Sequence, residues 1–119
     1  MLVDDDDKVL AGLRRMLRDT FEVVTASTLE AASELAYAQR FDAVVSDFHL
    51  TDASGLDVLA EIQRLQPSAV RILYTGDAAE APIVRDSLAN QLLADVLQKP
   101  VSKAVMVETL DRLIGKQRK

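Results

Sequence analysis

One stretch decides the fold of this chain: Ala43-Val44-Val45-Ser46-Asp47-Phe48-His49-Leu50. An apolar run leads to a single acid and then breaks into the polar segment 51–55. Short continuous apolar runs are typical of strands buried on both faces of a parallel sheet. We therefore expect a central strand with Asp47 at its carboxyl end, where open α/β sheets place their ligands.

Similar strand-like runs alternate with segments of helical periodicity on both sides of this stretch. The pattern predicts strands at 1–3, 21–25, 70–74 and 95–98 besides the central one. Apolar residues recur at helical spacing through 9–17, 29–36, 56–65, about 81–90 and 105–114. Five strands alternating with five helices predict an α/β fold with parallel strands joined by right-handed crossovers.

The polar residues at the strand ends are expected to meet at one edge of that sheet. The first strand is followed by the acids Asp4–Asp7, the central strand ends at Asp47, and the next two end at Thr75 and Lys99. Crowded carboxylates repel one another, and a hard divalent cation such as Mg²⁺ relieves that repulsion. A carboxylate beside Mg²⁺ can attack phosphorus, while an ammonium and a hydroxyl stabilise the transferred group.

Composition limits the other options. The 119 residues suggest one domain, and 49% hydrophobic residues indicate a globular chain. A net charge of −5 argues against nucleic-acid binding by the domain. No apolar run approaches the ~20 residues that span a bilayer. The lack of cysteine excludes thiolate chemistry and is compatible with a cytoplasmic location.

Four motifs in this order resemble those of response-regulator receiver domains over the whole chain, 1–119. They are Val3-Asp4-Asp5-Asp6, Ser46-Asp47 followed by Gly55, Thr75-Gly76, and Lys99-Pro100. The resemblance implies a flavodoxin-like, doubly wound sheet with strand order 2-1-3-4-5. It also implies a phosphorylation-activated switch of a two-component system, which is not an enzyme beyond its own phosphorylation and dephosphorylation.

The resemblance further implies a role for each matching residue. Asp47 corresponds to the phosphoacceptor, with Thr75 and Lys99 as the hydroxyl and the ammonium that act on the phosphoryl group. Asp4, Asp5, Asp47 and the backbone carbonyl of His49 correspond to the ligands of Mg²⁺ or Mn²⁺. The implied partners are a sensor histidine kinase or phosphotransfer protein and an output domain or downstream protein, with a phosphorylation-dependent homodimer as a further option.

Three positions depart from the family pattern. Thr51 stands where proline is frequent, which is expected to loosen the loop after Asp47. Val96 stands where an aromatic commonly rotates inward on activation, and Val101 where phenylalanine is frequent. We also expect a pair between His49 and Asp77 at the rim of the site, which would shield the phosphoryl group from water.

Other interpretations stay open at this stage. Asp4-Asp5-Asp6-Asp7-Lys8 is also the recognition sequence of a tag-removal protease, although the apolar residues before it and the amphipathic helix after it favour a native segment. A haloacid-dehalogenase-type phosphatase would use an Asp-x-Asp motif, but the second acid is His49 here. A phosphate-independent pseudo-receiver that only binds proteins is the third option.

Overall fold

The computed structural model describes residues 1–76 and 81–117. Within them the chain alternates between five strands and five helices. In order, these are β1 (Leu2–Val3), α1 (Asp7–Leu17), β2 (Thr25–Ala26), α2 (Leu29–Ala38), β3 (Ala43–Asp47), α3 (Gly55–Leu65), β4 (Val70–Thr75), α4 (Pro82–Ala89), β5 (Asp95–Gln98) and α5 (Lys103–Gln117). The strands form one parallel sheet in the order β2-β1-β3-β4-β5, which confirms the predicted topology.

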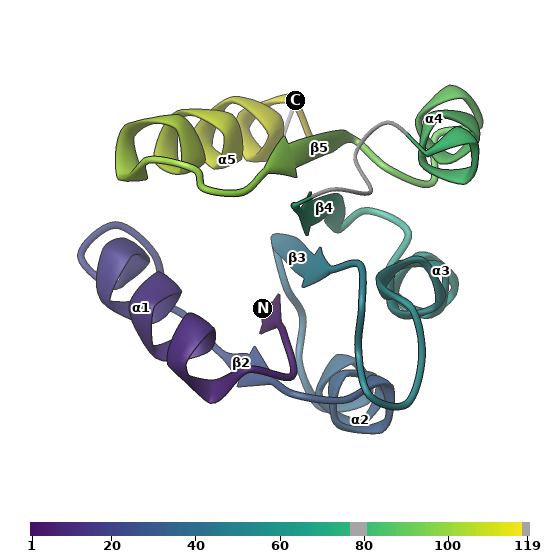
Figure 1. Cartoon of the computed structure of the whole chain (residues 1–119), viewed down its shortest axis with the longest axis horizontal. Helices are drawn as coiled ribbons and strands as arrows, with labels where there is room; N and C mark the ends of the chain where they lie inside the picture. Colours follow the sequence, from purple (N-terminus) through teal and green to yellow (C-terminus); the bar gives the residue numbers. More distant parts are fainter. Residues whose placement is uncertain (77–80, 118–119) are drawn as a thin grey trace.

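The sheet lies between two layers of helices (Figure 1). Helices α1 and α5 cover one face, and α2, α3 and α4 cover the other. Each layer has its own core, because successive strand residues point to opposite faces. Leu73 and Val44 belong to the cluster under α2–α4, whereas Ile72 and Val45 belong to the cluster under α1 and α5.

The second strand differs from its prediction. We expected it at 21–25, but β2 spans only Thr25–Ala26. In the described sheet β2 lies at the edge and pairs with β1, which is two residues long, so the ladder pairs Leu2 with Thr25 and Val3 with Ala26 and then ends. Phe21, predicted in that strand, instead packs from an irregular segment against the core beneath α1 and α5.

The helix beginnings follow the chemistry of their capping residues. Asp6 caps α1 by accepting from the backbone N–H groups of Lys8 and Val9, and Thr28 caps α2 in the same way. Ser54 and Asp57 form a reciprocal capping box at the start of α3. The acidic run at the N-terminal end is thus an integral part of the fold, since Asp6 starts a helix that covers the sheet.

Candidate functional site

Asp47 lies at the carboxyl end of β3, the central strand, as predicted. Its Oδ1 accepts a hydrogen bond from the backbone N–H of Phe48 at 2.9 Å and one from Lys99 Nζ at 3.2 Å. The side chain is 13% exposed, so it sits in a recess that still opens to solvent. The carboxylate is therefore held in one orientation by a backbone amide and an ammonium group.

Asp4 follows β1 at the same level of the sheet, because Val3 pairs with Ser46. Its Oδ1 accepts from the backbone N–H of Asp6 at 2.9 Å, while its buried Oδ2 has no hydrogen-bond partner. Lys99 Nζ lies 3.7 Å from this Oδ2, which makes an ion pair but is too far for a hydrogen bond. Burial raises the pKa of Asp4, and the neighbouring charge of Asp47 adds to the effect.

Asp5 brings a third carboxylate to the same place. Ligand oxygens of Asp4, Asp5 and Asp47 all lie within 4.8 Å of one another. Three carboxylates that leave one buried oxygen without a hydrogen bond suit a hard divalent cation, since Mg²⁺ takes oxygen ligands and keeps several waters. The residues present therefore fit a Mg²⁺ ion.

Lys99 reaches this cluster from the end of β5. Its backbone N–H donates to the carbonyl of Thr75 at 2.8 Å, and the Lys99–Pro100 peptide bond is cis. Burial alone would lower the pKa of Lys99, but the hydrogen bond and charge of Asp47, with the charge of Asp4, outweigh it and raise the pKa. The ammonium also lies 5.0 Å from the centre of the Tyr74 ring.

Thr75 ends β4, one residue beyond the Tyr74 that pairs with Asp47. The side chain is buried, with 1% exposed, and its backbone carbonyl holds the start of the Lys99 segment. The register therefore places Thr75 next to the strand end that carries Asp47, with Lys99 anchored to it.

His49 is exposed, and its ring meets the edge of Phe48 with the ring centres 4.9 Å apart. Its backbone forms an isolated bridge with Ser54 across the loop after β3. The predicted partner Asp77 lies outside the described residues, so the expected rim pair stays a prediction.

Several hydrogen bonds hold the loop after Asp47, which has Thr51 where proline is frequent. The Thr51 hydroxyl donates to Asp5 Oδ2 at 3.1 Å, and Asp52 Oδ1 accepts from the backbone N–H of Leu29 at 3.1 Å. Gly55 closes the loop, because its N–H donates to the Phe48 carbonyl at 2.6 Å. The sequence identified Thr51 only as a departure, and nothing in its local pattern indicated the contact with Asp5.

Val96 and Val101 pack against opposite cores of the protein, one on each face of the sheet. Val96 is half-buried against the cluster under α2–α4, and Val101 is half-buried against the cluster under α1 and α5. The aromatic next to Lys99 is instead Tyr74, on the neighbouring strand. Sequence reasoning treated Tyr74 only as the last residue of a strand.

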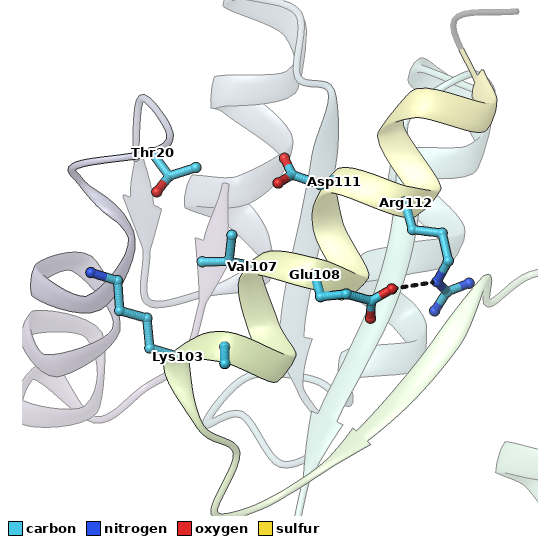
Figure 2. Close-up of a pocket in the computed structure, with 7 residues that line it drawn as sticks. Thr20, Lys103, Val107, Glu108, Asp111 and Arg112 are labelled. Atoms are coloured by element: carbon cyan, nitrogen blue, oxygen red, sulfur yellow. Dashed lines mark hydrogen bonds and ion pairs between the residues drawn. The ribbon is translucent and has the colours of Figure 1, made fainter.

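A separate surface hollow lies along α5, away from the carboxylate cluster (Figure 2). It is lined by Thr20, Lys103, Ala104, Val107, Glu108, Asp111 and Arg112. Arg112 pairs with Glu108 at 3.2 Å and with Asp95 of β5 at 3.8 Å. Its charged side chains, two basic and two acidic, are spread along an open surface and do not converge on one point as the carboxylate cluster does.

Comparisons with known proteins agree with this geometry. The family model "Response regulator receiver domain" matches residues 1–111. The transcriptional regulatory protein GlrR of Escherichia coli K12 is 30% identical over 114 residues, which cover 93% of this chain and 25% of that protein. The chain thus spans about a quarter of the length of that protein.

Solved structures give the same result. A CheY-like receiver domain protein from Methanospirillum hungatei JF-1 superposes with a TM-score of 0.90 at 24% identity, covering 98% of this chain and 93% of that one. The receiver domain of a sensor histidine kinase from Pseudomonas aeruginosa PAO1, solved with a magnesium ion coordinated in its active site cleft, has a TM-score of 0.81 at 26% identity, with 96% and 95% covered. The chain belongs to the response-regulator receiver family and is a receiver domain of two-component systems.

Proposed function

We propose that residues 1–119 form one receiver domain in which Asp47 accepts a phosphoryl group from a histidine kinase or phosphotransfer protein. One observation carries this proposal: oxygens of Asp4, Asp5 and Asp47 lie within 4.8 Å of one another, and Lys99 bonds directly to Asp47. Three acids and one ammonium group at one edge of the sheet match the charge distribution that phosphoryl transfer requires.

The chain's own residues perform most of the reaction by positioning. An oxygen of Asp47 forms a bond to phosphorus while the phosphorus–nitrogen bond of the donor phosphohistidine breaks. The imidazole leaves with the bonding electron pair and takes up a proton. Mg²⁺, or Mn²⁺ in its place, would be held by Asp4, Asp5, Asp47 and the His49 carbonyl, and would neutralise charge on the transferred group.

Lys99 and Thr75 bind the group that is transferred. Lys99 stays charged at neutral pH because Asp47 and Asp4 raise its pKa, so it can pair with a phosphoryl oxygen. The Thr75 hydroxyl binds another oxygen. The added group brings about two negative charges, which shifts the balance between two conformers of the surrounding loops. The domain catalyses only its own phosphorylation and dephosphorylation.

The rest of the signalling pathway belongs to the same proposal. Relatives named as transcriptional regulatory proteins are about four times longer than this chain, which supports an output domain or downstream protein as the recipient of the signal. None of the helices in the described part combines the length and apolarity needed to cross a bilayer. We also propose a cytoplasmic location, with which the lack of cysteine is compatible.

The test is phosphorylation by acetyl phosphate with and without Mg²⁺, followed by intact-protein mass spectrometry. We expect one Mg²⁺-dependent phosphoryl group that hydroxylamine removes, as it does acyl phosphates. Asp47→Asn should abolish the modification, whereas Asp19→Asn, which removes an exposed acid beyond the end of α1, should not. Modification that persists in Asp47→Asn would refute the proposed phosphoacceptor.

The same preparation separates the alternatives. A haloacid-dehalogenase-type phosphatase would hydrolyse small phosphate esters with turnover, and the receiver would not. A pseudo-receiver would take up no phosphate even with Mg²⁺ present. The buried Asp4 oxygen that lacks a hydrogen bond argues against a pseudo-receiver, because burying such a group is costly in a site that no longer binds cations.

A further inference from the structure

The three carboxylates of the cluster are supported in different ways. Asp4 is held by the backbone N–H of Asp6, and Asp47 by the backbone N–H of Phe48 together with Lys99. Asp5 is exposed, and in the described part of the chain its side chain is contacted by the hydroxyl of Thr51, 46 residues away. The orientation of the Asp5 carboxylate therefore depends on a side chain of the loop after β3.

Thr51 can hold Asp5 because its own loop is fixed at several points. Asp52 accepts a hydrogen bond from Leu29 N at the start of α2, and Leu50 N donates to the Ala53 carbonyl at 3.2 Å. His49 bridges to Ser54 across the same loop. A hydroxyl on a restrained backbone loses little entropy when it forms its hydrogen bond, so it can orient the acid that accepts it.

We propose that Thr51 is a positioning residue of the cation site, whose hydroxyl aims the Asp5 carboxylate at the space shared with Asp4 and Asp47. This inference rests on the proposed function, since it assumes that Mg²⁺ binds there. One oxygen of Asp5 takes the Thr51 hydroxyl, which leaves the other free for the ion. The hydrogen bond also connects the segment after β1, which carries Asp5, with the loop after β3, which carries the His49 carbonyl. The positions of these two sets of proposed ligands therefore depend on each other.

Hydrogen bonds to metal-binding side chains fix their direction, and losing one weakens metal affinity by about 10- to 100-fold. The test measures Mg²⁺ alone, with no phosphodonor, by calorimetric titration or by backbone amide chemical shifts. Thr51→Val keeps the size of the side chain and removes the hydroxyl. We expect it to weaken Mg²⁺ binding about 10-fold or more, while Thr51→Ser, which keeps a hydroxyl, stays close to the wild type.

Thr20→Val is the matched control, because Thr20 is an exposed threonine beyond α1 with the same substitution. It should leave Mg²⁺ affinity unchanged. Thermal unfolding without Mg²⁺ is run on all variants, and we expect Thr51→Val and Thr51→Ser to unfold near the wild-type temperature. If Thr51→Ser is folded and keeps the Mg²⁺ affinity that Thr51→Val loses, the loss is due to the missing hydroxyl that orients Asp5 and not to general damage to the loop.

The outcomes separate this inference from the function beneath it. If the wild type binds Mg²⁺ and Thr51→Val binds it equally well, the positioning role is refuted and the phosphorylation switch stands. Tighter binding by Thr51→Val would also refute it, because the hydroxyl would then be obstructing the carboxylate. No Mg²⁺ binding by the wild type would refute the cation-dependent function and this inference with it.

Discussion

Gly55 is the residue whose substitution should reveal how tightly the backbone is packed behind Asp47. A Cβ at this position would overlap the Asp47 carbonyl oxygen and would lie 2.8 Å from its carbonyl carbon and 3.1 Å from Leu73 Cδ1. Unstrained carbon atoms lie about 3.5–4.0 Å apart. In Gly55→Ala the two backbone segments must therefore separate by roughly 0.7 Å or more, the shortfall from the lower limit of that range.

This displacement falls on the residue that we propose as the nucleophile. A misplacement of about 1 Å in a reacting group can cost roughly 100-fold in rate. We expect Gly55→Ala to slow phosphorylation by acetyl phosphate at least about 10-fold, since the forced shift approaches that size. Overpacking of a close contact should also lower the free energy of unfolding by about 1–3 kcal/mol.

The assay follows the initial rate of phosphorylation by mass spectrometry at saturating Mg²⁺, together with urea unfolding of the unmodified protein. Gly12→Ala is the control, because Gly12 lies inside α1 and a Cβ there would make only an ordinary contact, 3.9 Å from Arg15 Nη2. That variant should gain about 0.5–1 kcal/mol of stability and keep its rate. Wild-type rate and stability in Gly55→Ala would refute the reasoning, because the loop would then absorb a methyl group without moving Asp47.

Three further predictions concern the surroundings of the site. Without Mg²⁺, Asp4→Asn should raise the unfolding temperature at neutral pH, because burial raises the folded-state pKa of Asp4 and the ionised carboxylate therefore destabilises the fold. This gain should shrink as the pH falls from the folded-state pKa toward 3.8, below which Asp4 is protonated in both the folded and the unfolded state. A gain that does not depend on pH would contradict the prediction. Tyr74→Leu should slow phosphorylation about 2- to 30-fold, because it removes the ~0.5–2 kcal/mol cation–π contact with Lys99. Tyr74→Phe keeps the ring, so an equal loss of phosphorylation rate in that variant would show that the hydroxyl matters instead. Arg71 donates hydrogen bonds to four backbone carbonyls in the segments that lead into β4 and β5. Arg71→Met should therefore lower the free energy of unfolding, measured by urea titration, by about 2 kcal/mol or more. Unchanged stability would mean that water replaces these hydrogen bonds without cost.

The order of elements and the meeting of the strand ends could be predicted from local sequence. Apolar periodicity marked each helix, because burial of one face imposes a repeat on neighbouring residues. Continuous apolar runs marked most strands, because strands of a parallel sheet are buried on both faces. Parallel connections then forced Asp4, Asp47 and Lys99 to one edge. These conclusions needed no knowledge of distances, since topology alone decides which strand ends are neighbours.

Only the tertiary structure decided the contacts between distant segments. Thr51 meets Asp5 across 46 residues, and Lys99 meets Asp47 across 52, in geometries that no short pattern encodes. The length of β2 was likewise set by its partner β1 and not by its own β-branched residues. The local sequence determines which conformation a residue prefers. The free-energy cost of a buried group without a hydrogen bond, such as Asp4 Oδ2, depends instead on which side chains reach it from elsewhere in the chain.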